Sequence, residues 1–171
     1  MQMLSGRYAY TVGANAEVIV DGVPDQLPTN IRTVADLLSQ QAGWATAAFG
    51  KWDAGMTSWG CTPTCRGFDH FSGFYNAYND YFTHTVGPGL DLRQDFAADS
   101  AENGTYFTEL LTTRVTSWIK GGSFSSDTGA VNIYSPPQCA HTVVHGIRLE
   151  GLLTHQSPTY PRYAHVKLNM A

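Results

Sequence analysis

Two side chains in this sequence are suited to bind an anion because each follows a short apolar segment. Lys51 comes shortly after the apolar segment 44–49, and His141 comes shortly after the apolar segment 131–134. In open α/β sheets, ligands bind just beyond the carboxyl ends of the strands. Each residue also has an ordinary alternative: a surface lysine that extends past Trp52, and a loop histidine bonded to backbone. Two such residues at equivalent strand ends favour an anion site more strongly than either one alone.

Six aspartates raise the question of a metal site. They are Asp53, Asp69, Asp80, Asp91, Asp95 and Asp99. Their spacing does not match a calcium-binding loop, so we expect solvated or capping roles for them. Sequence motifs for phosphate-binding loops, dinucleotide sites, zinc proteases and serine hydrolases are absent.

The segment Asn103-Gly104-Thr105 is an acceptor sequence for N-glycosylation. It stands directly before a predicted helix. Such a site implies a secretory route, although short sequences of this kind also arise by chance.

A helix is predicted to precede the first strand. Thr29 or Asn30 can cap its start, and Gly43 ends it. Four residues at helical spacing define its buried face: Val34, Leu37, Leu38 and Gln41.

A second helix over 107–119 has the most regular spacing in the chain. Its predicted buried residues are Leu110, Leu111, Val115 and Trp118. Together with strands over 45–49 and 131–134, this pattern predicts an α/β fold in which both strands share one sheet and both helices pack on it. A short strand is expected over 17–20, and the aromatic, Gly-rich stretch 50–104 is expected to be a long loop region.

The composition excludes several classes of protein. The chain has 171 residues with a net charge of −4, 14% charged and 12% aromatic residues. It therefore resembles neither a disordered chain nor a polycation for nucleic acid. The longest apolar run, residues 44–50, is too short for a membrane span of about 18 residues, and the first residues lack the apolar core of a signal peptide.

Eight short stretches, in one order, resemble the sulfatase family, and specifically the arylsulfatase group of the alkaline-phosphatase-like superfamily. They are residues 5–8 (SGRY), 27–29 (LPT), 33–46 (TVADLL and QAGWAT), 49–52 (FGKW), 62–73 (TP, RGFDHF and G), 80–84 (DYFTH), 106–110 (YFTEL) and 138–142 (QCAHT). The likeness is strongest over 5–146, and 147–171 stay unassigned, so the chain resembles a partial sulfatase domain over 1–171. The fold implied is a partial alkaline-phosphatase-like sheet flanked by helices.

The resemblance implies hydrolysis of sulfuric esters by a hydrated formylglycine, with calcium on the sulfate oxygens. Lys51 and His141 would then be the catalytic and substrate-binding pair, and they should approach each other at the carboxyl edge of the sheet because parallel strands lie about 4.8 Å apart. The implied ligand is a sulfated small molecule or a sulfated glycan, and the implied location is secretory, extracellular or lysosomal.

Three departures from the family pattern bear on activity. The family carries histidine two positions after the lysine, where this chain has Asp53, which should lie near Lys51. The C-x-P-x-R nucleophile segment is expected before Met1, and the family's calcium ligands are expected outside this chain. Residues 61–66 (CTPTCR) imitate that segment with Cys65 at the arginine position, so we expect a structural loop or a Cys61–Cys65 disulfide there, with Cys139 free.

Three interpretations therefore stay open. The chain is a sulfatase-family hydrolase that is incomplete and inactive by itself, or it is a non-catalytic, sulfatase-derived protein that binds anionic glycans. An unrelated α/β interaction domain would require the ordered motifs to be coincidental. Without the remaining edge strands, the isolated chain is expected to be poorly stable.

Overall fold

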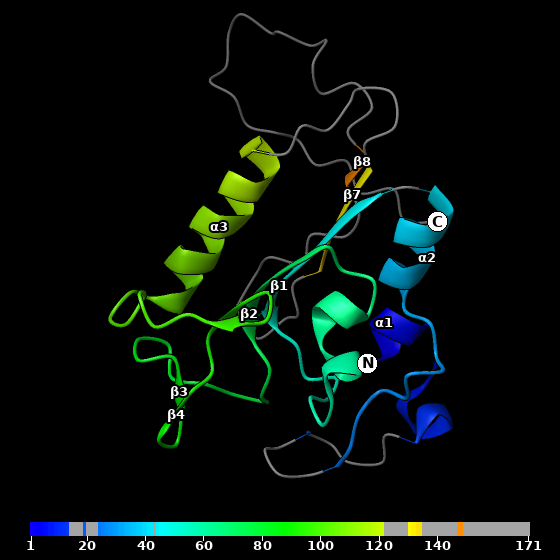
Figure 1. Ribbon diagram of the computed structural model, residues 1–171, viewed down its shortest axis with the longest axis horizontal. Coiled ribbons are helices and arrows are strands. Elements are labelled where there is room, and N and C mark those ends of the chain that lie inside the picture. Colours follow the sequence, from blue (N-terminus) through cyan, green and yellow to red (C-terminus); the bar gives the residue numbers. More distant parts are fainter. Residues whose placement is uncertain (14–18, 20–23, 43, 122–129, 135–146, 149–171) are drawn as a thin grey trace, which may run out of the picture.

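The computed structural model describes residues 1–13, 19, 24–42, 44–121, 130–134 and 147–148. The predicted strand over 17–20, together with Cys139 and His141, lies outside these residues. A mixed sheet stands between α3 on one side and α1 and α2 on the other (Figure 1). This arrangement confirms the predicted α/β class.

The main sheet has six strands in the order β6-β5-β2-β1-β7-β8. Its three longer strands, β1 (Ala45–Lys51), β2 (His70–Phe74) and β7 (Ala130–Tyr134), are parallel. The antiparallel edges are β5 (Arg93–Gln94), β6 (Ala97–Ala98) and β8 (Ile147–Arg148). A separate hairpin pairs β3 (Thr85–Val86) with β4 (Gly89–Leu90).

The sheet confirms one sequence prediction and corrects another. The segments predicted at 45–49 and 131–134 do pair as parallel neighbours. The expectation of a long loop over 50–104 is wrong in part, because β2 is an inner strand of the sheet. A glycine explains why β2 sits so close to β1: a Cβ on Gly73 would lie 1.9 Å from the carbonyl oxygen of Gly50.

Helix α2 (Val34–Ala42) begins later than predicted. Neither Thr29 nor Asn30 caps it. The Thr33 hydroxyl accepts from Asp36 N–H (3.0 Å), and the Asp36 carboxylate accepts from Thr33 N–H (2.8 Å), which is a reciprocal cap. The predicted buried face is also wrong, because Val34 and Leu37 are exposed while Ala35 is fully buried.

Helix α3 (Phe107–Gly121) matches its prediction closely. Leu110 and Leu111 are buried, as predicted, together with Phe107. Val115 and Trp118 are only partly buried, and both pack against the core cluster that this helix forms with β1 and β2.

Four shorter helices complete the described structure. They are α1 (Gln2–Ser5) and the single turns η1 (Ala9–Val12), η2 (Trp59–Cys61) and η3 (Pro63–Cys65). In this loop region Cys61 is buried and Cys65 is exposed, and both thiols are free, so the suggested Cys61–Cys65 disulfide is not formed. No helix among the described residues is long and apolar enough to cross a bilayer.

Candidate anion site at the carboxyl edge of the sheet

Lys51 is the last residue of β1, and the sheet fixes its backbone. Its Cα pairs with that of Phe74 on β2, and the next residue, Trp52, donates its N–H to the Phe74 carbonyl (2.9 Å). The Trp52 ring is buried, and its indole N–H donates to the carbonyls of Gly55 and Cys61, each at 3.0 Å. Strand pairing and this buried ring therefore hold the backbone on both sides of Lys51.

The Lys51 ammonium is paired with a carboxylate of its own chain. Only 7% of the Lys51 side chain is exposed, and its Nζ lies 3.0 Å from Oδ2 of Asp53, which is 30% exposed. Asp53 adopts a left-handed backbone conformation (φ 48°), which is uncommon for a residue with a Cβ. Its second oxygen, Oδ1, is buried without a hydrogen-bond partner among the described residues. The ion pair therefore balances the lysine charge, and one carboxylate oxygen stays unsatisfied.

The amino end of α1 lies in the same electrostatic environment. Burial lowers the pKa of the Met1 amino group below its ordinary value of 8.0, Asp53 acts to raise it, and Lys51 acts to lower it further. Met1 also packs against the core cluster that contains Trp52. Met1 thus lies in the neighbourhood of Lys51 and Asp53.

The predicted partner His141 lies outside the described residues, so its approach to Lys51 stays a prediction. What the structure places is the strand before it. Tyr134, the last residue of β7, pairs in parallel with Ala48 of β1. The carboxyl ends of these two strands consequently lie at one edge of the sheet, and His141 follows seven positions later in the sequence.

The aspartates of the described region serve structural roles. Asp91 accepts from the N–H groups of Tyr75 (3.1 Å) and Asn76 (2.9 Å), and Asp69 accepts from Thr46 N–H (2.8 Å). Hydrogen bonds from the N–H of Thr83, and then of Phe82, lower the pKa of the exposed Asp80 carboxyl. No group of three metal-ligating side chains occurs among the described residues. The described residues therefore supply no set of side chains that fits a calcium ion.

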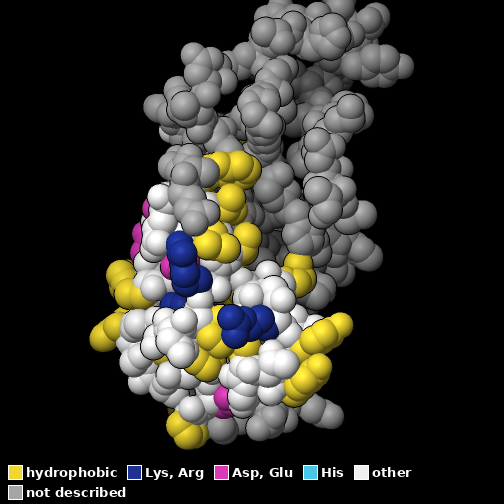
Figure 2. Space-filling view, turned by 90° about the vertical axis from the view of Figure 1, so that its right-hand side faces the viewer, with side chains coloured by type: hydrophobic (Ala, Val, Ile, Leu, Met, Phe, Trp, Pro, Cys, Tyr) yellow, Lys and Arg dark blue, Asp and Glu magenta, His cyan; other side chains and the backbone are white. Residues whose placement is uncertain are grey.

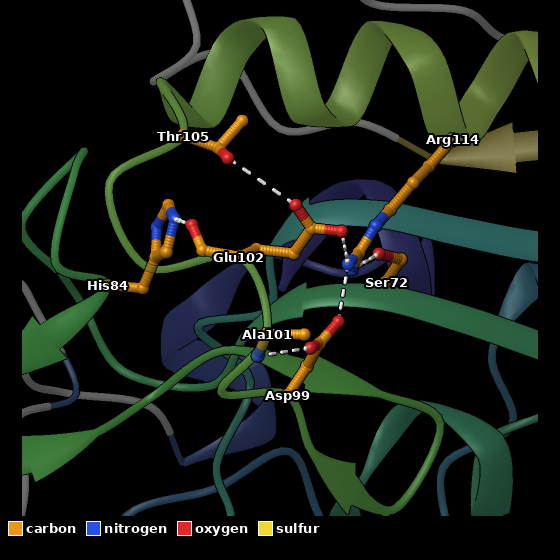
Figure 3. A network of polar contacts seen from close by, with 7 residues as sticks. All are labelled: Ser72, His84, Asp99, Ala101, Glu102, Thr105 and Arg114. Carbon is orange, nitrogen blue, oxygen red and sulfur yellow. Dashed lines mark hydrogen bonds and ion pairs between the residues drawn. The ribbon is translucent and has the colours of Figure 1, made fainter.

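An arginine that the sequence analysis missed holds α3 to the sheet (Figure 3). Arg114 donates to Ser72 Oγ on β2 (2.8 Å), to Asp99 and to Glu102 (3.3 Å). A signal for it was present in the sequence. Arg114 stands one helical turn after Leu110 and Leu111, and a charge on a buried helical face requires buried partners.

Comparison with known proteins matches this chain to one family model and to two arylsulfatases. The family model described as Sulfatase matches residues 1–132. Mouse arylsulfatase J is 36% identical over 120 residues (67% of this chain, 20% of the relative), and rat arylsulfatase G is 37% identical over 89 residues (52% of this chain, 16% of the relative). The chain therefore spans a fifth or less of the length of these relatives.

Solved structures share the fold. The crystal structure of Ps i-CgsB superposes with a TM-score of 0.62 at 21% identity, and its complex with k-i-k-neocarrahexaose superposes with a TM-score of 0.64 at 20% identity. Each match covers 80% of this chain and 33% of the other.

Proposed function

The chain belongs to the sulfatase family, and from this premise we propose that it contributes Lys51 and His141 to a site that holds the sulfate group of a sulfuric ester. The observation that carries the proposal is the buried ammonium of Lys51 at the carboxyl end of a parallel strand. A fixed cation there, shielded from water, stabilises negative charge on a bound ester more than a solvated lysine does.

The balance of charge at this site favours binding over turnover. Asp53 already neutralises Lys51, and a carboxylate repels the sulfate that a histidine at this position would attract. The sequence also contains no C-x-P-x-R segment, and the described residues hold no calcium site. We therefore expect this chain to bind sulfate weakly and to hydrolyse no aryl sulfate, with or without calcium.

The ligand class follows from the family and from one structural neighbour. Sulfated small molecules and sulfated glycans both present the anionic group that Lys51 would contact. The complex of Ps i-CgsB with k-i-k-neocarrahexaose, an oligosaccharide by its name, favours the glycan.

Titration with inorganic sulfate, followed by calorimetry, tests the proposal. Asp53→Asn frees the ammonium and should tighten binding about tenfold, or ~1.4 kcal/mol, while Lys51→Gln should abolish it. Glu109→Gln removes the same charge from an exposed position on α3 and should change nothing. Unchanged sulfate affinity in Lys51→Gln would contradict the proposed site.

Hydrolysis needs a separate assay. Full activity is expected only when a nucleophile segment is supplied and Asp53→His is made in the same protein. Measurable hydrolysis of an aryl sulfate by the unmodified chain would show that Asp53 does not silence the site.

A further inference from the structure

The turn that carries the glycosylation sequence lies against a group of exposed aromatic rings. Asn103 is exposed in the turn over 101–104. The N–H of Gly104 donates to the carbonyl of Phe82 (2.8 Å), and the N–H of Phe107 donates to the carbonyl of Tyr81 (2.9 Å). The backbone on both sides of Thr105 is therefore bonded to the segment that presents the rings.

Three rings form this surface, which we call the aromatic platform: Tyr81, Phe82 and Tyr106. Phe82 is 54% exposed, and its ring centroid lies 5.4 Å from that of Tyr106, which is 37% exposed. Tyr81 stands edge-on to Tyr106 at 6.0 Å and stacks on the buried Phe107 at 6.1 Å. The platform is thus fixed to the core from below while its outer faces meet solvent.

The turn itself is held rigidly by polar contacts (Figure 3). Nε2 of the fully buried His84 lies 3.0 Å from the Glu102 carbonyl oxygen, and the Glu102 carboxylate accepts from Arg114 (3.3 Å). The Thr105 hydroxyl donates to the other Glu102 oxygen (3.4 Å). Asn103 therefore projects from a turn whose position relative to the platform is already set.

We propose that Asn103 carries an N-linked glycan and that the first N-acetylglucosamine of this glycan packs on the aromatic platform. Asn103 Nδ2 bonds to C1 of the sugar and loses a proton, while the diphosphate of a lipid-linked oligosaccharide donor leaves from C1. The apolar C–H face of a pyranose is complementary to the electron-rich face of an aromatic ring. Contiguous exposed apolar surface marks interaction sites, and a sugar attached next to the platform needs no separate binding event.

The test uses the full chain, fused to a cleavable secretion signal, as secreted from a glycosylating eukaryotic host. Intact mass before and after peptide N-glycosidase treatment measures occupancy of Asn103. An endoglycosidase that leaves one sugar then gives a form to compare with Asn103→Gln. The single sugar should raise the melting temperature by about 3 °C, and Phe82→Ser should remove that increment. Tyr10→Ser, which alters an exposed ring in η1, should retain it.

The two parts of the proposal fail differently. An unmodified mass would overturn both parts. If Asn103 is fully occupied but the sugar raises the melting temperature equally in Phe82→Ser and wild type, glycosylation is confirmed and the packing on the platform is overturned. If Phe82→Ser does not fold, the wild type decides: a ring-current shift of the sugar's acetyl methyl in the NMR spectrum supports the packing, and its absence overturns it.

Discussion

Lys51 and Asp53 form an ion pair at the carboxyl end of β1. The sequence placed Lys51 correctly at a strand end, because a buried apolar run followed by a lysine has few other arrangements. It also indicated that Asp53 would lie nearby. The burial of the Lys51 side chain and the left-handed backbone conformation of Asp53 could not be predicted, since both depend on packing by Trp52 and on hydrogen bonds with β2.

Arg66 is a second buried cation, and it binds backbone instead of a carboxylate. It is 2% exposed and donates to the carbonyls of Leu27 (2.8 Å), Pro28 (3.3 Å) and Ile31 (2.6 Å). Arg66→Met removes the side-chain donor from these carbonyls, of which Pro28 keeps a hydrogen bond from the Ile31 N–H (3.0 Å). The variant should lower the free energy of unfolding by about 3 kcal/mol in urea denaturation. Arg32→Met, which removes an exposed hydrogen bond to Gln40, should cost less than about 0.5 kcal/mol. Equal losses in the two variants would refute this role of Arg66.

Tyr75 should make the protein sensitive to alkali. Burial raises the pKa of its phenol from 10.0 to about 12, against the opposing effect of Arg93. Because the folded pKa is the higher one, the stability that this group contributes is complete below pH 10 and is lost as the pH rises toward 12. Tyr75→Phe should flatten the decline in urea midpoint across that window, and the exposed Tyr10→Phe should not. If the urea midpoint of Tyr75→Phe falls as steeply as that of the wild type, other groups cause the alkaline loss of stability.

At the scale of elements, the spacing of apolar residues predicts an element correctly where that element buries one face against the core. Helix α3 follows this rule, whereas β1 is buried on both faces and was predicted from its short apolar run. Strand β2 was missed because its sequence, HFSGF, carries a serine and a glycine that are typical of loops. Ser72 binds Arg114 and Gly73 permits contact with β1, so both are explained only by tertiary partners. The prediction of the buried face of α2 was wrong for a similar reason, because the helix packs its small residue, Ala35, against the core.

The contact between β1 and β2 depends on Gly73. Because an added Cβ would overlap the Gly50 carbonyl, Gly73→Ala should separate the strands and cost about 3 kcal/mol or more in chemical denaturation. Gly89→Ala provides the control. The nearest atom to its added Cβ is 3.6 Å away, so its stability should change by less than about 1 kcal/mol. Wild-type stability in Gly73→Ala would mean that the strands tolerate a wider spacing.

The described part of the chain exposes many large apolar side chains. Over the face that carries α1 and α2, hydrophobic groups alternate with two groups of basic side chains (Figure 2). Among the described residues, exposed hydrophobic side chains include Trp59 (65%), Tyr8 (65%) and Leu37 (39%). The edges of the main sheet are strands of two residues, which add little pairing.

We therefore expect the chain to unfold at a modest temperature. Differential scanning calorimetry should place its melting temperature below about 65 °C, the upper end for ordinary mesophilic domains. Cooperative unfolding well above that value would mean that the two core clusters stabilise the chain more than their size indicates.

The central place of β1 in the sheet also bears on how the proposed anion site can open. Ala47 and Ala48 pair with β2 on one side and with β7 on the other. In hydrogen exchange, amides bonded within such a strand exchange only when the surrounding sheet separates, whereas helix ends and short edge strands exchange by local fraying. Lys51 is the last residue of this inner strand. Its ammonium should therefore keep its position through fluctuations that displace α1, β6 and the hairpin of β3 and β4.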